Sequence, residues 1–113
     1  MKYIITILIS LMLSTSLAFA HGGGHAKIKE SQVIEYSDKN IAIVIAQQIK
    51  IEGKELDKSW FNIAKSNKKI YKKGEGYYIS TFKNDKNNKT LYILLSEAGE
   101  LYDANYTGKF KGL

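Results

Sequence analysis

The residues best suited to chemistry are two histidines, His21 and His25, which three glycines separate. They follow the tripeptide Ala18-Phe19-Ala20, whose small first and third residues are typical of a signal-peptidase cleavage site. Cleavage after Ala20 would make His21 the first residue of the mature chain. Its free α-amine would then lie beside its own imidazole and close to the imidazole of His25.

Such a chain end offers three nitrogen ligands to one metal ion. The α-amine has a pKa of about 7.7–8.0, so it loses its proton near neutral pH at little cost. Ligand sets rich in nitrogen and free of sulfur suit Cu²⁺ first, and then Ni²⁺ or Zn²⁺. The sequence therefore predicts metal binding by His21 and His25, with Cu²⁺ or Zn²⁺ as the bound ion. The alternative is a solvated linker whose histidines have no role.

Two other groups of residues are candidates for binding. Glu97, Glu100 and Asp103 lie close together in the sequence and suit a cation, although exposed acids of this kind are usually solvated. The C-terminal half also holds more tyrosines than one helix can cover: Tyr71, Tyr77, Tyr78, Tyr92, Tyr102 and Tyr106. Some of them are expected on an open sheet face that binds a peptide or a protein. Ordinary half-buried sheet tyrosines are the alternative.

The rest of the sequence argues against an enzyme. The chain has no cysteine, which excludes a thiol nucleophile, a disulfide and a cysteine-based metal site. Both histidines precede the expected domain, so no Ser-His-Asp arrangement forms within it. Phosphate-binding, dinucleotide-binding and H-E-x-x-H motifs are absent from the sequence. We therefore expect a non-enzymatic binding or accessory protein.

The positive charge does not by itself indicate a nucleic-acid partner. The chain has 17 basic and 11 acidic residues, a formal net charge of +6, and every basic residue is lysine. Arginine is the side chain preferred for bidentate contacts to bases and phosphates. Because the lysines are spread along the whole chain, they predict a solvated surface and no nucleic acid among the partners.

Residues 1–20 are expected to direct the chain out of the cytoplasm. Lys2 precedes an apolar stretch over 3–13, and small residues follow, which is typical of a cleaved secretory signal. An uncleaved anchor is the alternative, but a membrane span needs about 20 apolar residues. We therefore expect a signal peptide over 1–20, a flexible tail and linker over 21–36, and a small domain over 37–113. The expected location is the periplasm or the extracellular space, with no membrane span after cleavage.

The domain is expected to be α+β, with one N-terminal helix packed on a three- to four-stranded antiparallel β-meander. Ser37 suits the N-cap of the helix, and Gly53 is expected to end it after about residues 50–51. Apolar residues spaced three and four apart form the expected buried helix face: Ile41, Val44, Ile45 and Ile49. Because many of these residues are β-branched, a strand over 41–46 is the alternative.

From Ile63 onward, the apolar residues follow a two-residue period. This period predicts strands over 63–71, 77–84, 90–96 and 101–107. A glycine-rich turn over 72–76, a polar loop over 85–89 and a turn over 97–100 separate them. Residues 108–113 are expected to form a short basic tail. Trp60, the only tryptophan, is expected to close one end of the core.

Two resemblances rest on these motifs. The run YYISTF…KTLYILLSEAGELYDANYTG resembles the hairpins of PepSY-type domains, which are small exported or membrane-attached modules. Nearly the whole chain resembles a family of small exported bacterial proteins of unknown function. The shared motifs are a His/Gly-rich start at 21–25, an L-D-x-S-W connection at 56–60 and a T-L-Y…G…N-x-T-G ending at 90–108. The PepSY resemblance implies a metal-free module that inhibits or modulates a partner protein.

Overall fold

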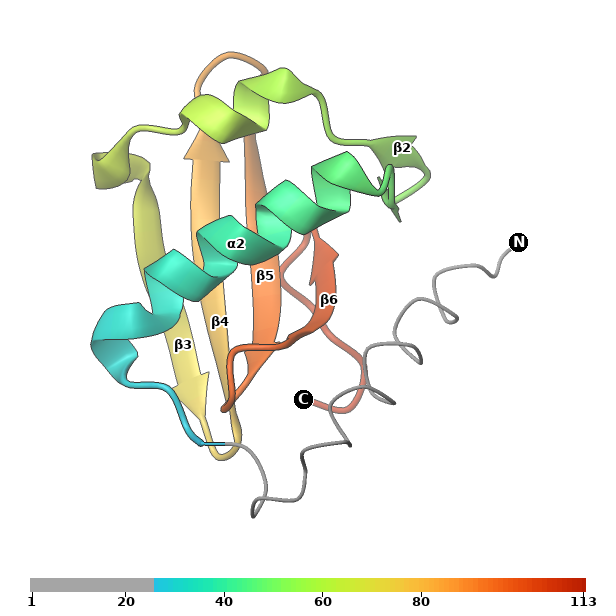
Figure 1. The fold of residues 1–113 in the computed structure, drawn as a ribbon. Helices are drawn as coiled ribbons and strands as arrows, with labels where there is room; N and C mark the ends of the chain where they lie inside the picture. The colour runs from blue at the N-terminus through green and yellow to red at the C-terminus, as the bar shows by residue number, and fades with distance from the viewer. Residues whose placement is uncertain (1–25) are drawn as a thin grey trace.

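The computed structural model describes residues 26–113, in which one helix lies across a four-stranded antiparallel sheet (Figure 1). A single 3-10 turn, η1 (Glu30–Gln32), leads into the helix α2 (Val33–Ala46). The strands follow one another in space as they do in sequence: β3 (Lys68–Gly74), β4 (Tyr77–Asn84), β5 (Lys89–Ser96) and β6 (Leu101–Asn105). The expected α+β fold is therefore confirmed, with four strands in the meander.

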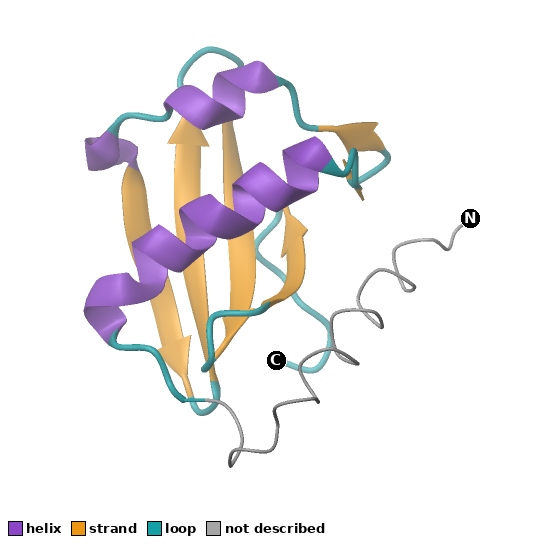
Figure 2. Ribbon diagram, viewed as in Figure 1, coloured by secondary structure: helices purple, strands orange, loops and turns teal. Residues whose placement is uncertain are grey.

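Short elements connect the helix to the sheet, as the colouring by secondary structure shows (Figure 2). They are the hairpin strands β1 (Lys50–Ile51) and β2 (Lys54–Glu55) and the 3-10 turns η2 (Lys58–Asn62) and η3 (Lys65–Asn67). None of the helices within residues 26–113 has the length and apolar character that crossing a membrane requires.

The prediction that Ser37 caps the helix is wrong. The helix begins at Val33, and Ser37 lies inside it with none of its surface exposed. The Ser37 hydroxyl donates to the carbonyl oxygen of Val33 at 2.8 Å and lies 2.7 Å from the hydroxyl oxygen of Ser80 in β4. Inside a helix, a serine hydroxyl can bond the carbonyl oxygen four residues earlier in place of capping the helix end. Residues 33–36, expected in the linker, are therefore the first turn of α2.

The helix also ends earlier than predicted, at Ala46. Gln48 adopts a left-handed φ of 54°, and the chain then turns into the β1–β2 hairpin. Glu52 and Gly53 have φ values of 49° and 86°, and two successive positive values are typical of a tight hairpin turn. Gly53 therefore turns this hairpin and does not end the helix.

The first predicted strand is wrong over its N-terminal half, because residues 65–67 form η3 and β3 begins at Lys68. The side-chain amide of Asn67 donates to the Lys83 carbonyl at 3.1 Å and to the Asp85 carboxylate at 2.9 Å. These bonds hold the 3-10 turn against the β4–β5 loop. The bounds predicted for β4 are confirmed at both ends.

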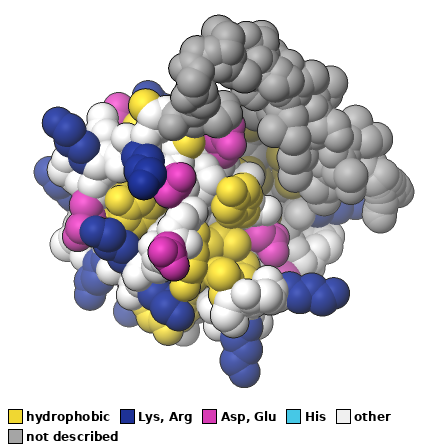
Figure 3. Space-filling view, turned by 90° about the horizontal axis from the view of Figure 1, so that it is seen from below, with side chains coloured by type: hydrophobic (Ala, Val, Ile, Leu, Met, Phe, Trp, Pro, Cys, Tyr) yellow, Lys and Arg dark blue, Asp and Glu magenta, His cyan; other side chains and the backbone are white. Residues whose placement is uncertain are grey.

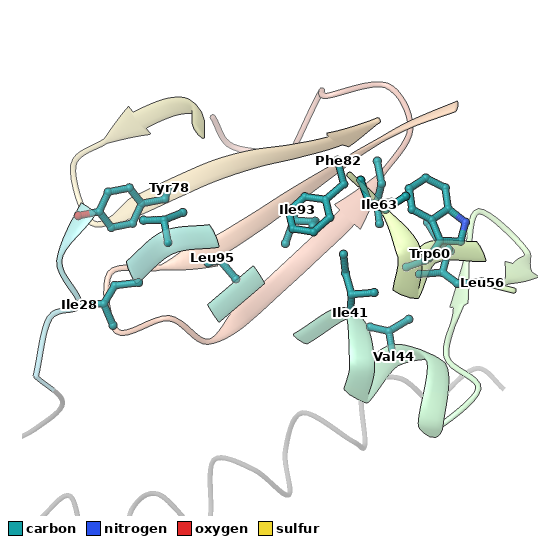
Figure 4. Packing of buried hydrophobic residues seen from close by; sticks show 13 residues of the cluster. Ile28, Ile41, Val44, Leu56, Trp60, Ile63, Tyr78, Phe82, Ile93 and Leu95 are labelled. Atoms are coloured by element: carbon teal, nitrogen blue, oxygen red, sulfur yellow. The ribbon is translucent and has the colours of Figure 1, made fainter. Parts of the chain in front are cut away.

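The main hydrophobic core lies between α2 and the sheet (Figure 4). Strands β4 and β5, together with Val33 of α2, supply its most deeply buried side chains. Trp60 closes one end with 4% of its surface exposed, as expected. The buried residues of this core are Ile28, Val33, Ile41, Val44, Ile51, Leu56, Trp60, Ile63, Tyr78, Phe82, Leu91, Ile93 and Leu95. The helical stripe predicted at Ile41 and Val44 is therefore the face that packs on the sheet.

A second, smaller cluster lies on the opposite face of the sheet. Ile79 in β4 and Leu94 in β5 are buried there beneath Phe110, which is 7% exposed. The C-terminal residues, expected as a basic tail, therefore fold back and cover part of this face with one aromatic ring. A Cβ atom on Gly108 would lie 2.7 Å from the Tyr92 ring, so this backbone passes in close contact with β5.

Replacing either residue of the buried pair Ser37 and Ser80 with alanine is expected to lower stability by different amounts. Ser37 has one hydroxyl proton and gives it to Val33, so Ser80 must donate the bond between the two serines. Ser37→Ala leaves the Ser80 donor buried without an acceptor and should cost about 1–3 kcal/mol. Ser80→Ala leaves the Ser37 donor satisfied and should cost about 0.5–1.5 kcal/mol. Urea unfolding of both variants checks the order, and a larger loss for Ser80→Ala would contradict it.

Candidate functional site

The predicted metal ligands His21 and His25 lie outside the described residues. The described chain begins at Ala26 and is held at Ile28, whose N–H donates to the Glu97 carbonyl at 2.8 Å. The Ile28 side chain is buried in the main core. In the sequence, His21 and His25 therefore directly precede the point at which the described chain is anchored to the sheet.

The carboxylates near this point do not form a metal site. Within residues 26–113, no three or more histidine, cysteine, aspartate or glutamate side chains lie close enough to hold an ion. The Glu97 carboxylate is 3.8 Å from the Lys27 ammonium, and Asp103 accepts from the N–H of Ala104. Figure 3 shows the molecule from below, where lysine and acidic side chains alternate around a hydrophobic area. Glu97 and Asp103 therefore interact with Lys27 and with the backbone, and neither they nor Glu100 belong to a metal-binding cluster within residues 26–113.

The tyrosines predicted on an open face divide between the two sides of the sheet. Tyr78 and Tyr106 belong to the core beneath α2. On the opposite side, Tyr71 is 58% exposed and its ring lies 5.1 Å from the ring of Tyr92 in an edge-to-face arrangement. Tyr77 borders the Phe110 cluster on that side. The sheet therefore has one face without a covering helix, and its aromatic residues are partly exposed.

A β-bulge brings Tyr71 onto this face. In the pairing of β3 with β4, Ile70 lies opposite Ser80 and Lys72 opposite Ile79, so Tyr71 is the extra residue. A bulge redirects the side chain of the residue it adds. The Tyr71 ring reaches Tyr92 on β5, two strands away in the sheet. The contact between the two rings depends on the bulge.

A polar pocket of about 160 Å³ lies where η2 and η3 meet the β4–β5 loop. Asn84 is 2% exposed at its base; its amide donates to the Ser59 hydroxyl at 2.8 Å and its carbonyl accepts from the Lys86 N–H at 2.9 Å. Ligand pockets usually enclose about 300–1,000 Å³. Because the amide nitrogen and the carbonyl oxygen of the Asn84 side chain both bond within the protein and the pocket is small, we interpret this site as structural.

Asp57 and Tyr106, two titratable residues near η2, stabilise the fold. Hydrogen bonds from the Ser59 hydroxyl and then from the Ser59 N–H hold the pKa of the Asp57 carboxyl below its ordinary value. Burial raises the pKa of the Tyr106 phenol, and the carboxylates of Glu52 and Asp57 raise it further. Glu52 accepts from the Tyr106 N–H at 2.8 Å. These groups cap η2 and fasten the β1–β2 hairpin to the end of β6.

The sequence pattern did not predict how the lysines of β3 are divided between the two faces of the sheet. Lys68 bonds the Asp38 carboxylate at 3.0 Å, and Lys73 lies 3.4 Å from that of Glu30, both on the helix side. Lys69 and Lys72 pair with Thr81 and Ile79 and therefore point to the opposite face. The run KKIYKK carries the lysines and the tyrosine, but only the bulged register assigns each side chain to a face.

Together these features define a small α+β protein with a helix on one face of a meander and a partly open aromatic face on the other. The chain belongs to DUF6488, a family of unknown function whose model matches residues 1–109. No curated protein and no solved structure matches the chain. The resemblance to a family of small proteins of unknown function is therefore confirmed, and none of the comparisons finds the PepSY family.

Proposed function

We propose that this chain is a small exported, non-enzymatic binding protein that captures Cu²⁺, or a similar ion such as Zn²⁺ or Ni²⁺, with its N-terminal tail. The ligands are the α-amine and imidazole of His21 and the imidazole of His25. One observation carries the proposal: both histidines of the chain lie within five residues of each other and directly ahead of the point where the chain is anchored. The family match over 1–109 includes this tail together with the fold.

The composition of the folded part supports this assignment. Residues 26–113 contain neither histidine nor cysteine, and no acidic cluster of metal-binding size occurs among them. A nitrogen-rich site must therefore come from the tail. The folded part supplies the attachment, because Ile28 is bonded through its backbone and buried through its side chain.

The alternative function is a PepSY-like interaction or inhibitory module that acts without a metal. The observation that favours it is the sheet face without a covering helix, on which the exposed Tyr71 contacts Tyr92. A helix packed on an antiparallel meander is also the architecture that the resemblance to PepSY-type domains implies. Substitution of the histidines distinguishes the two functions, because only the metal-binding function requires them.

The exported protein should first be weighed intact, with a mass that begins at His21 as the expected result. Titration with Cu²⁺ should then give 1:1 binding. His21→Ala and His25→Ala should each weaken it about tenfold or more, since the loss of one ligand costs more than the roughly 1.4 kcal/mol that corresponds to a tenfold change. Lys27→Ala, in the same segment, is the matched control and should bind as the unchanged protein does.

Amide NMR spectra locate the ion independently. Paramagnetic Cu²⁺ on the tail should broaden the signals of Ile28, Glu97 and Gly76, because the Glu97 N–H donates to Gly76 beside the anchored Ile28. A mass that starts elsewhere, or binding that survives the loss of both histidines, would contradict the metal proposal. In that case, the sheet-face alternative becomes the leading explanation.

A further inference from the structure

One face of the sheet combines exposed lysines with tyrosine rings that contact each other. It consists of Tyr71, Tyr92, Lys69, Lys72 and Lys83, and is called here the tyrosine–lysine face. Lys83 belongs to it because alternation along β4 places it with Ile79 and Thr81, opposite the helix side. Phe110 covers the neighbouring Ile79 and Leu94, so the apolar part of this side is already closed.

The lysines of β3 differ in whether they form ion pairs, according to the face of the sheet on which they lie. On the helix side, Lys68 and Lys73 contact the acids Asp38 and Glu30 at 3.0 and 3.4 Å. The ion pairs of residues 26–113 involve neither Lys69 nor Lys72, which lie exposed on the other face. Acidic side chains therefore balance the lysine charge of β3 on the helix side, whereas the lysines on the opposite face have no ion-pair partner within residues 26–113.

An acid on this side lies too far away to compensate the charge. Asp103 shares a row of the sheet with Lys72, through Ile79 and Leu94. Three strand spacings of about 4.8 Å separate the two residues by roughly 14 Å, which exceeds the screening length at physiological salt. Asp103 therefore does not balance the charge of Lys72, which lies next to the exposed Tyr71 in β3.

Tyrosine gives this charged face a means of holding a protein. An exposed aromatic ring with a hydroxyl contributes apolar contact and a hydrogen bond at small entropic cost, and tyrosine is enriched at protein interfaces. A broad strand surface suits a macromolecule better than a small ligand, which prefers a concave apolar pocket. Complementary charge speeds the encounter and selects the partner.

We propose that the tyrosine–lysine face is the docking surface for an acidic segment of another protein. Carboxylates of the partner contact Lys69, Lys72 and Lys83, while an apolar or aromatic side chain packs against the paired rings of Tyr71 and Tyr92. This function is separate from metal capture, because its residues lie in the fold and those of the metal site lie in the tail. Either one can fail without the other.

The test uses a polyglutamate peptide as the probe and amide NMR of the full exported protein as the readout. The largest shifts should fall on the strand residues Lys69, Tyr71 and Tyr92. The double variant Lys69→Glu and Lys72→Glu should weaken binding about tenfold or more. Tyr71→Ala should weaken it as well, without altering the net charge.

A second double variant distinguishes binding at this face from general attraction between the protein's positive charge and the peptide. Lys58→Glu with Lys65→Glu changes the net charge by the same amount at two exposed lysines of η2 and η3. This control should bind the peptide as the unchanged protein does. Equal weakening by both pairs overturns the proposal, and so does tighter binding to phosphatidylglycerol vesicles than to the peptide. Circular dichroism of each variant confirms that the fold is kept.

Discussion

Replacing Phe82 with alanine is expected to lower the free energy of unfolding by about 3–5 kcal/mol, as for other fully buried phenylalanines. The ring has no exposed surface and lies on the helix side of β4, between Lys68 of β3 and Leu91 of β5. The Lys68 ammonium lies 5.3 Å from the centre of the ring, so the change also removes a cation–π contact. For a domain whose total stability is on the order of 5–15 kcal/mol, this loss is severe.

Phe61 supplies the matched control, since it is the same residue type in the 3-10 turn η2 with 54% of its surface exposed. Phe61→Ala should change stability by about 0.5 kcal/mol or less. Urea unfolding followed by the fluorescence of Trp60, which is buried and the only tryptophan, measures both variants. Similar losses for the two variants would show that Phe82 is not a centre of the core.

The second large effect is expected at Gly99, in the turn between β5 and β6. Its φ of +87° is unfavourable for any residue with a Cβ, and an added Cβ would collide with the ring of Tyr36 on α2. The backbone cost of about 1–2 kcal/mol adds to an overpacking cost of about 1–3 kcal/mol. Gly99→Ala should therefore destabilise the protein by about 2–5 kcal/mol.

Gly76 isolates the two contributions, because its φ of +83° is nearly the same and nothing lies within 4 Å of an added Cβ. Gly76→Ala should cost only the backbone part, about 1–2 kcal/mol. In a Tyr36→Ala background, the extra cost of Gly99→Ala should disappear. Thermal or urea unfolding of these variants checks both statements, and an equal cost at both glycines would rule out the collision with Tyr36.

The parts of the fold that follow from local pattern could be predicted from the sequence. Strand β4 is bounded by a glycine-rich turn and a polar loop, and its alternating residues place Tyr78 and Phe82 on one side and Ile79 on the other. The two-residue period alone supplies this assignment. The helix face at Ile41 and Val44 follows in the same way from spacing.

The helix ends could not be placed by local preference. Serine favours the N-cap, but Ser37 lies inside the helix, where it bonds the preceding turn and contacts Ser80 on a distant strand. At the other end, Ile51 pairs in a hairpin whose strands are only two residues each. Such choices depend on tertiary contacts, which override intrinsic propensity.

The candidate surfaces were only partly visible in the sequence. His21 and His25 are recognisable from residue type and spacing alone, and they remain a prediction. An open face rich in tyrosine was expected. Which residues form the tyrosine–lysine face, however, depends on the bulge at Tyr71 and on Phe110 covering Ile79 and Leu94. The division of the β3 lysines into paired and unpaired sets follows from the same register.

The attachment of Ile28 to Glu97 determines when during synthesis the chain can complete its fold. The hairpins of the meander form between neighbouring segments, whereas the first anchored residue bonds a residue that emerges from the ribosome only after β5. Phe110, which follows β6, then covers part of the opposite face. Contacts between distant segments form late because the loop they close is long. A growing chain therefore cannot anchor the segment ahead of α2 on the sheet until Glu97 has been made.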